Sequence, residues 1–366
     1  MVSSGSWKVA AGACASSRCR NRGSTAALLR SLRFWASVAI SAVFIGLFLR
    51  ATHPRELADA LEQADYWYIL PATGVLFFAI SARCVRWSVL MRPVAPMSPA
   101  RLFPYAIIGY MANNLLPARA GEVVRAYVLG DREKVSKMGT FGTIAVERLF
   151  DGCVLVLMLL IAGSVVGFES GRLQAIAIVS SVIFVAAIVG FYVLTLSEER
   201  AKRVVHRILR VFDRFLPDRL EQRVEEMADS LVSSLRSVHN PRSLGLVVLF
   251  SAIAWTIEAS AYAVIGQGFD LGVSFAHYCL LLSAANLAII IPTFFGGTGP
   301  FEWAAKLVLV GAGVDDAQAG AYSVVAHAFI LVPTTILGLI LLWSFGVSFR
   351  RITHAEVQEE PGVAAP

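Results

Sequence analysis

Residues 113–122 read Asn113-Asn114-Leu115-Leu116-Pro117-Ala118-Arg119-Ala120-Gly121-Glu122, and residues 292–302 read Pro292-Thr293-Phe294-Phe295-Gly296-Gly297-Thr298-Gly299-Pro300-Phe301-Glu302. Both stretches interrupt an apolar run with proline and glycine, and a glutamate then starts the next apolar run. Interrupted, charged segments at corresponding places in two halves of a chain are typical of a transporter's binding site. Because polar groups are costly at bilayer depth, such residues usually have a function.

The composition indicates a polytopic helical membrane protein. The chain has 366 residues, of which 57% are hydrophobic and 16% are charged, and its mean hydropathy is +0.66. Soluble domains contain about 25% charged residues, and a β-barrel would show alternating segments of about ten residues. The net charge of +6 comes mostly from short loops and termini, where basic residues set orientation and meet anionic headgroups. We therefore expect no nucleic-acid partner.

The apolar runs predict an all-α fold with about six spanning helices. A spanning helix needs about 20 apolar residues, and the candidate runs are 34–49, 66–85, 140–168, 173–196, 244–269 and 319–345. Two other apolar stretches, 102–117 and 275–295, lead into the polar motifs and are interpreted as re-entrant segments. Such segments occur only where protein or a watery cavity surrounds them. A single transmembrane domain over 34–349 follows.

The distribution of basic residues predicts the topology. The basic segment 1–33, expected to be disordered, places the N-terminus in the cytoplasm, and the acidic tail 350–366 is expected to be disordered and cytoplasmic. The first motif then enters from the cytoplasm and the second from the opposite face. The halves, 66–196 and 243–349, would form an inverted-topology repeat, joined by a cytoplasmic amphipathic connector, 198–242. We expect the protein in the cytoplasmic (inner) membrane.

Charged residues near the first motif are candidates for headgroup binding. Arginine suits phosphate because its planar fork donates two parallel hydrogen bonds, so Arg119, Arg125 and Arg148 are candidate phosphate ligands. Glu147 and Asp151 share a helix face, and together with Glu122 and Glu302 they would shape the cavity or bind a cationic headgroup. The alternatives are a structural ion-pair network around Arg148, and an inner-surface loop whose arginines meet anionic lipid.

The second motif combines a glycine turn with a buried acid. Pro300 suits the first position of a helix, and Glu302 lies one turn from Lys306, with which it can pair. His327 is the other candidate partner of Glu302. Glu258 lies within a span, which suggests either proton coupling or a hydrogen-bonded structural acid. We expect Arg83 and Arg86, near a helix end, to extend to the cytoplasmic interface.

The candidate substrate-binding residues are therefore Asn114, Arg119, Glu122, Arg125, Glu147, Arg148, Asp151, Glu258, Gly297, Gly299, Glu302 and His327. No catalytic residue, metal ligand or cofactor is assigned, because the sequence shows no C-x-x-C pair, no nucleotide-binding motif and no soluble catalytic domain. A membrane protein that is not an enzyme is favoured.

The combined pattern resembles the lysylphosphatidylglycerol synthase transmembrane region, also called the flippase-like domain or UPF0104. The residues that carry the resemblance are Asn114, Pro117, Arg119, Gly121, Glu122 and Arg125, then Glu147-Arg148-x-x-Asp151, then Pro292, the Gly-Gly-x-Gly turn and Glu302. The resemblance covers roughly 34–349 and implies a membrane unit to which lipid translocation is attributed. Members commonly have an arginine in the last helix, where this chain has His327.

The leading hypothesis is a flippase-like protein that translocates or handles an anionic or phosphate-bearing lipid. Expected partners are membrane lipids (a phospholipid, a hopanoid or a polyprenyl-linked lipid), and the sequence leaves homo-oligomers open. One alternative is an intramembrane lipid-modifying transferase in which Glu147 or Asp151 acts as base. Another is an accessory scaffold for a lipid synthase or glycosyltransferase.

Overall fold

The computed structural model describes residues 54–116, 120–167, 240–289 and 295–345, together with isolated positions at 43, 46 and between 171 and 186. Within these ranges the chain is helical and no strand occurs. The predicted spans 34–49 and 173–196, apart from those isolated positions, lie outside the described residues, as do the 1–33 segment, nearly all of the 198–242 connector and the 350–366 tail. So do Pro117, Arg119 and Pro292 of the two motifs.

Four described helices are long and apolar enough to cross a membrane. They are Tyr66–Met91, which comprises the 3-10 turn η1 (Tyr66–Tyr68) and α4 (Ile69–Met91), then α7 (Lys137–Val166), α11 (Pro241–Gly268) and α14 (Asp316–Ser344). Each contains or closely matches a predicted span. Helix α11 begins two residues inside the predicted connector because Asn240 caps it, accepting a hydrogen bond from the Arg242 N–H at 3.0 Å.

The outward faces of these helices are apolar. Leu157, Ile161 and Val165 form an exposed stripe on α7, and Val332, Ile336 and Ile340 form a similar stripe on α14. Exposed Trp67 and Trp343 lie near the ends of the first and last of the four long helices. Contiguous apolar surface bordered by tryptophan is what a helix presents to lipid.

Each polar motif separates two short helices that pack against each other. The first pair is α5 (Pro99–Leu115) and α6 (Gly121–Glu133), and the second is α12 (Phe275–Ala288) and α13 (Pro300–Gly311), preceded by the turn η4 (Phe295–Gly297). Helices of 17, 13, 14 and 12 residues are shorter than the roughly 20 residues that a span requires. The predicted helix–break–helix arrangement is confirmed for both motifs.

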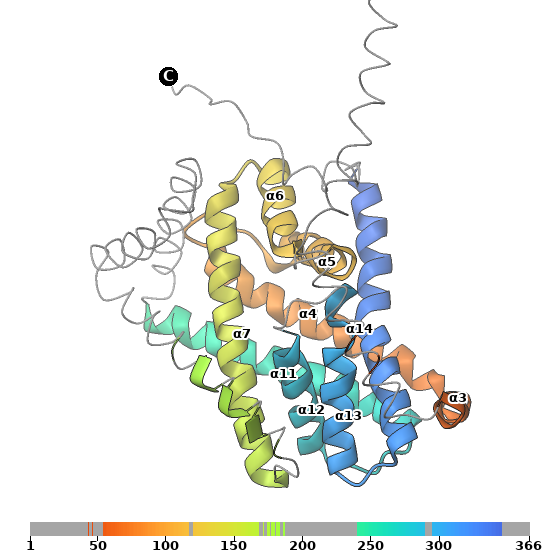
Figure 1. The fold of residues 1–366 in the computed structure, drawn as a ribbon. Coiled ribbons are helices and arrows are strands. Elements are labelled where there is room, and N and C mark those ends of the chain that lie inside the picture. The colour runs from red at the N-terminus through yellow and green to blue at the C-terminus, as the bar shows by residue number, and fades with distance from the viewer. Residues whose placement is uncertain are drawn as a thin grey trace, which may run out of the picture.

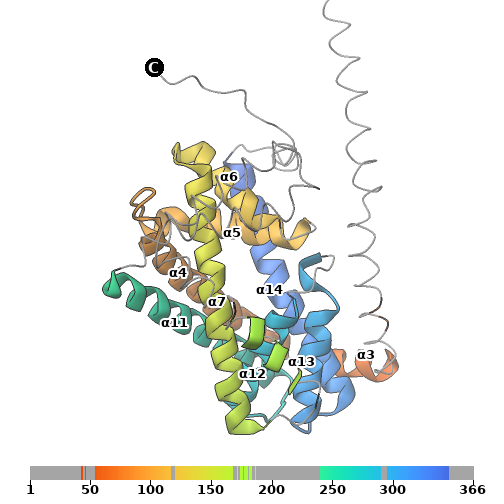
Figure 2. The ribbon, with the colours of Figure 1, turned by 60° about the vertical axis from the view of Figure 1, so that its left-hand side comes forward.

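The two halves share one order of elements and exchange their packing. Each runs from a long helix through two short helices to another long helix: α4, α5, α6, α7 and then α11, α12, α13, α14. Helix α4 packs along α11, α5 packs on α14, and α12 packs on α7, while the additional helix α3 (Pro54–Gln63) packs on α14. Figures 1 and 2 show α6 toward one end of the bundle and α13 toward the other. This is the arrangement expected of two hairpins that enter from opposite faces, although the membrane topology itself stays a prediction.

Candidate functional site

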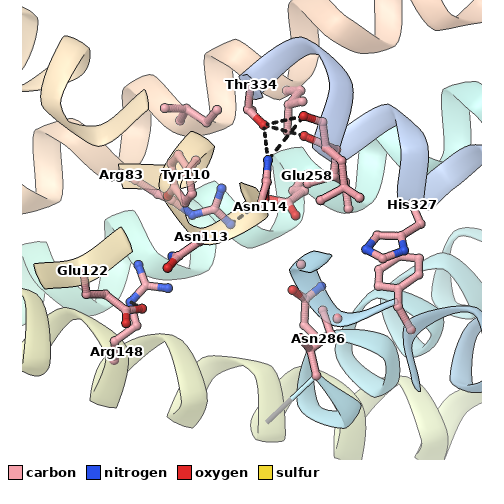
Figure 3. Close-up of a pocket in the computed structure, with 18 of the residues that line it drawn as sticks. Arg83, Tyr110, Asn113, Asn114, Glu122, Arg148, Glu258, Asn286, His327 and Thr334 are labelled. Atoms are coloured by element: carbon pink, nitrogen blue, oxygen red, sulfur yellow. Dashed lines mark hydrogen bonds and ion pairs between the residues drawn. The ribbon is translucent and has the colours of Figure 1, made fainter. Parts of the chain in front are cut away.

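A cavity of about 370 Å³ lies where the two broken segments meet the long helices. Its apolar wall includes Leu76, Ile80, Ile289, Phe301, Ile330 and Leu331. Its polar lining comprises Arg83, Tyr110, Asn113, Asn114, Glu122, Arg148, Glu258, Asn286, His327 and Thr334. Figure 3 shows Glu122 and Arg148 on one side and His327 on the other, with asparagines between them. The cavity thus has a charged end, marked by Glu122 and Arg148, and an opposite end, marked by His327.

The first break is held by two neighbouring asparagines. Asn113 Oδ1 accepts a hydrogen bond of 2.8 Å from the Gly121 N–H, which satisfies a backbone donor at the start of α6. Asn114 Nδ2 contacts the Leu331 carbonyl at 3.2 Å, Thr334 Oγ1 at 3.1 Å and Thr335 Oγ1 at 2.9 Å, all on α14. The end of α5 is therefore attached to the last long helix of the other half.

Glycine is required at this break for steric reasons. A Cβ on Gly121 would lie 2.2 Å from the Gly109 carbonyl oxygen and 2.5 Å from Asn113 Oδ1. No larger residue fits there without moving α5 away from α6. The close approach of the two helices brings Asn113 to the cavity.

The second break depends on glycines in the left-handed region. Gly296, Gly297 and Gly299 have φ of 60°, 105° and 103°, where residues with a Cβ are strained. Pro300 then begins α13, and Glu302 Oε2 accepts a hydrogen bond of 2.7 Å from the Gly299 N–H. The glutamate of the motif thus caps its own helix.

Glu302 also binds His327, 25 residues further along the chain. Its Oε1 lies 2.7 Å from His327 Nδ1, which confirms the pairing considered from the sequence. The other candidate, Lys306, contacts α14 as well: its Nζ lies 2.6 Å from Asp316 Oδ2 at the start of that helix. Glu302 and Lys306 are one turn of α13 apart, and both contact α14, at His327 and at Asp316.

Two arginines, Arg83 and Arg148, and two carboxylates, Glu122 and Glu258, line the cavity. Arg83 Nη2 lies 2.6 Å from Glu258 Oε2. Arg148 Nη2 lies 2.8 Å from Glu147 Oε1 and 3.4 Å from Asp151 Oδ2, and Arg148 Nε lies 3.9 Å from Glu122. The Arg148 side chain is 37% exposed and the Glu122 side chain 23% exposed. These two are the accessible charges of the cavity.

A buried ion-pair network supports Arg148 from behind. Arg86 contacts Asp151 at 2.5 Å and Glu147 at 3.1 Å, and Arg125 contacts Glu147 at 3.2 Å. Arg125 also lies over the Trp87 ring, with 3.4 Å from its Cζ to the ring centroid. Removing one partner of a buried pair costs about 3–5 kcal/mol. The network therefore holds α4, α6 and α7 in place and fixes the carboxylates that orient Arg148.

The candidate residues from the sequence fall into three groups. Asn114, Glu122, Arg148, Glu258, Gly297 and His327 line the cavity. Arg125, Glu147, Asp151, Gly299 and Glu302 lie behind that lining and position it. Arg119 lies outside the described residues.

The predicted extension of Arg83 and Arg86 to the interface is wrong. Their exposed fractions are 6% and 0%, and both bind carboxylates inside the bundle. Helix α4 continues to Met91, so these arginines lie more than a turn inside the helix end. Apolar Leu90 and Met91, which follow them, were the signal that could have indicated burial. Tyr110 and Thr334 also line the cavity but were not predicted from the sequence. Nothing in the sequence marks them, because isolated hydroxyl side chains are common in apolar helices.

Comparison with known proteins identifies the fold unit that contains this cavity. Residues 34–338, which include every residue of the cavity lining, match the family described as the lysylphosphatidylglycerol synthase TM region. No solved structure matches the chain.

Curated relatives agree with this match. A UPF0104 membrane protein of Methanothermobacter thermautotrophicus is 28% identical over 85% of this chain and 95% of its own length. A UPF0104 membrane protein of Pyrococcus horikoshii is 22% identical over 77% of this chain and 88% of its own length. Glycosyltransferase AglD of Haloferax volcanii is 27% identical over 91% of this chain, which spans only 58% of that relative. Together with the four apolar helices, the match over 34–338 shows that this chain is a multi-pass membrane protein of the lysylphosphatidylglycerol synthase TM region family.

Proposed function

We propose that this protein translocates or handles a phosphate-bearing lipid in the cytoplasmic membrane, with both termini in the cytoplasm. The headgroup would enter the cavity between the two hairpins while the acyl chains stay in the bilayer. The observation that carries the proposal is an accessible arginine, Arg148, inside a 370 Å³ cavity that both helix breaks line.

Charge and hydrogen bonding make Arg148 the candidate phosphate ligand. Two buried carboxylates, Glu147 and Asp151, bind the Nη2 of its guanidinium, and 37% of the side chain remains accessible. A guanidinium donates paired hydrogen bonds to phosphate oxygens. A charge kept at membrane depth is costly, which favours a role in recognition. Arg83 lines the same cavity and offers a second cation, balanced by Glu258.

The apolar wall suits the remainder of a lipid. Leu76 and Ile80 of α4 face the cavity, as do Ile330 and Leu331 of α14. A site that is apolar with a few placed polar groups is typical of ligand pockets. We therefore expect the glycerol backbone to lie against this wall and the phosphate to lie at the charged end.

Reconstituted vesicles provide the test. Purified protein is inserted into liposomes with acyl-labelled phosphatidylethanolamine or phosphatidylglycerol, and loss of inner-leaflet label to a membrane-impermeant quencher reports translocation. Arg148→Ala is expected to slow exposure by about tenfold or more, because a charge-assisted phosphate contact contributes about 1.5–3 kcal/mol. Glu122→Ala should also change the rate.

Arg101→Ala is the matched control. Arg101 pairs with Glu133 at an exposed site outside the cavity lining, so its loss should leave translocation unchanged. Wild-type rates in Arg148→Ala and Glu122→Ala, with both variants folded, would exclude this cavity as the lipid path.

A lipid-modifying transferase is the second candidate, favoured by the relative named glycosyltransferase AglD. Glu147 and Asp151 are unsuited as bases because arginines bind both of them and neither lines the cavity. Glu122, which is more accessible, would take that role. Incubation of purified protein with a labelled polyprenyl-phosphate donor decides: a modified lipid supports transfer, and translocation without any product excludes it.

A further inference from the structure

The end of the cavity opposite Arg148 contains a histidine, His327, with one bound and one unbound ring nitrogen. His327 is 3% exposed, and its Nδ1 lies 2.7 Å from Glu302 Oε1. No group among the described residues binds its Nε2, which is fully buried. His327 is also part of the cavity lining, and Figure 3 shows its ring reaching from α14 toward the cavity, on the side away from Arg148.

The partners of Glu302 orient the ring of His327. Glu302 Oε2 accepts the Gly299 N–H, and Oε1 lies 2.7 Å from His327 Nδ1. An ionised carboxylate in this arrangement orients an imidazole with its proton on Nδ1. In the neutral imidazole the lone pair is then on Nε2, which makes this atom a hydrogen-bond acceptor.

The surroundings of the ring leave this acceptor for a ligand. Phe301 stacks on the imidazole with a centroid separation of 4.4 Å and an interplanar angle of 16°, so the ring cannot easily turn. Ile330, three residues along α14 from His327, also lines the cavity, and its side chain offers no donor. Buried polar atoms in native proteins almost always have a partner, and an unmade hydrogen bond is costly. The geometry suits a donor that arrives with the bound molecule.

The charged end does not select a ligand by net charge. Arg83, Arg86, Arg125 and Arg148 are matched by Glu122, Glu147, Asp151 and Glu258. Every one of these arginines contacts at least one of these carboxylates, so among the described residues the phosphate meets four arginines balanced by four carboxylates. Discrimination between phosphate-bearing headgroups then depends on the other end of the cavity.

We propose that His327 is a specificity-determining, ligand-contacting residue, which accepts a hydrogen bond from an N–H or O–H donor of the headgroup. The substrate class is a phosphate-bearing lipid whose headgroup carries such a donor, an ammonium or a hydroxyl group, beyond the phosphate. This inference rests on the proposed function, since it places the headgroup in the same cavity.

The test compares three lipids that differ in their N–H groups. Short-chain phosphatidylethanolamine, its N,N-dimethyl derivative and phosphatidylcholine are titrated against the detergent-purified full chain, and binding is measured by native mass spectrometry. All three are zwitterions with one phosphate. The dimethyl lipid keeps one N–H but approaches choline in bulk, so it separates hydrogen bonding from size.

Wild-type protein should bind phosphatidylethanolamine and the dimethyl lipid about tenfold more tightly than phosphatidylcholine, the ratio that one hydrogen bond supplies. His327→Phe should reduce the preference to less than about twofold without weakening phosphatidylcholine binding. His327→Gln can present an acceptor near the position of Nε2 and should keep most of the preference. Glu302→Gln, whose amide can donate to Nδ1, favours the other tautomer and should abolish it.

Two results overturn the inference and leave the proposed function intact: equal affinity of the wild type for all three lipids, or an undiminished preference in His327→Phe. A dimethyl lipid that binds like phosphatidylcholine also overturns it, because bulk would then explain the difference. Absence of binding by all three lipids contradicts the proposed function itself. Loss of all binding in Arg148→Ala would instead support the phosphate site.

Discussion

Arg83 on α4 and Glu258 on α11 bind each other across the two halves of the molecule, with 2.6 Å between Arg83 Nη2 and Glu258 Oε2. The guanidinium also lies over the Trp255 ring, with 4.4 Å from its Cζ to the ring centroid. All three residues line the cavity. The first helices of the two halves are thus joined by a charge pair at the cavity wall.

Glu258→Ala leaves Arg83 buried without its counter-charge. We expect the free energy of unfolding to fall by about 3–5 kcal/mol, measured by thermal and denaturant unfolding of the protein in detergent. The double variant Arg83→Met/Glu258→Leu removes both charges at similar volume and should recover most of that loss. A double variant as unstable as Glu258→Ala would show that the pair is not the cause.

Gly297→Ala should destabilise the second break by about 1–3 kcal/mol. The residue has φ of 105°, and a Cβ there would lie 2.4 Å from Ile289 Cγ2. The control is Gly74→Ala within α4, where an added Cβ meets nothing within 4 Å. This substitution should stabilise the helix by about 0.5–1 kcal/mol. The shift in melting temperature should therefore have opposite signs in the two variants.

A cysteine pair tests whether the first break contacts the other half. Asn114 Nδ2 lies 2.9 Å from Thr335 Oγ1, so Asn114→Cys/Thr335→Cys should cross-link with a short thiol-reactive reagent. Substitution of Cys14, Cys19, Cys84, Cys153 and Cys279 provides the background. The control pair is Asn114→Cys/Trp343→Cys, because Trp343 is exposed on the outer face of α14. Equal cross-linking of both pairs contradicts the described contact.

Inverted topology predicts labelling from opposite sides of the membrane. In the same background, Asp131→Cys near the end of α6 should react with an impermeant thiol reagent only from the cytoplasmic side. Gln267→Cys near the end of α11 should react only from the outside. Both positions are exposed at helix ends. Labelling of both from one side contradicts the predicted orientation of the hairpins.

The lengths of the apolar runs predicted the four long helices that the structure describes. The two glycine-containing motifs predicted the breaks between the short helices. These features are local, since a span needs only a run of apolar residues and a break needs only the backbone freedom of residues such as Gly121 and Gly297. The pairing of Glu302 with His327, which the sequence offered as one of two candidates, is also present in the structure.

Partners across helices could not be predicted in the same way. The sequence assigns no partner to Glu258, because Arg83 is far away along the chain and only the packing of α4 on α11 joins them. Arg125 was predicted as a phosphate ligand, yet it turns toward Trp87 and Glu147, and its Cβ packs where Gly109 has no side chain. A helical position defines direction only relative to its own axis, so burial depends on the neighbouring helix.

The exchange of packing, with α5 on α14 and α12 on α7, interlocks the halves. A fragment ending before the connector would have to fold with α5 lacking its α14 surface, and the complementary fragment would leave α12 without α7. Cutting the connector should therefore yield two polypeptides that are each degraded when expressed alone but complement each other when co-expressed. Each hairpin packs on a long helix of the other half, so we expect neither half to fold as a smaller version of the protein.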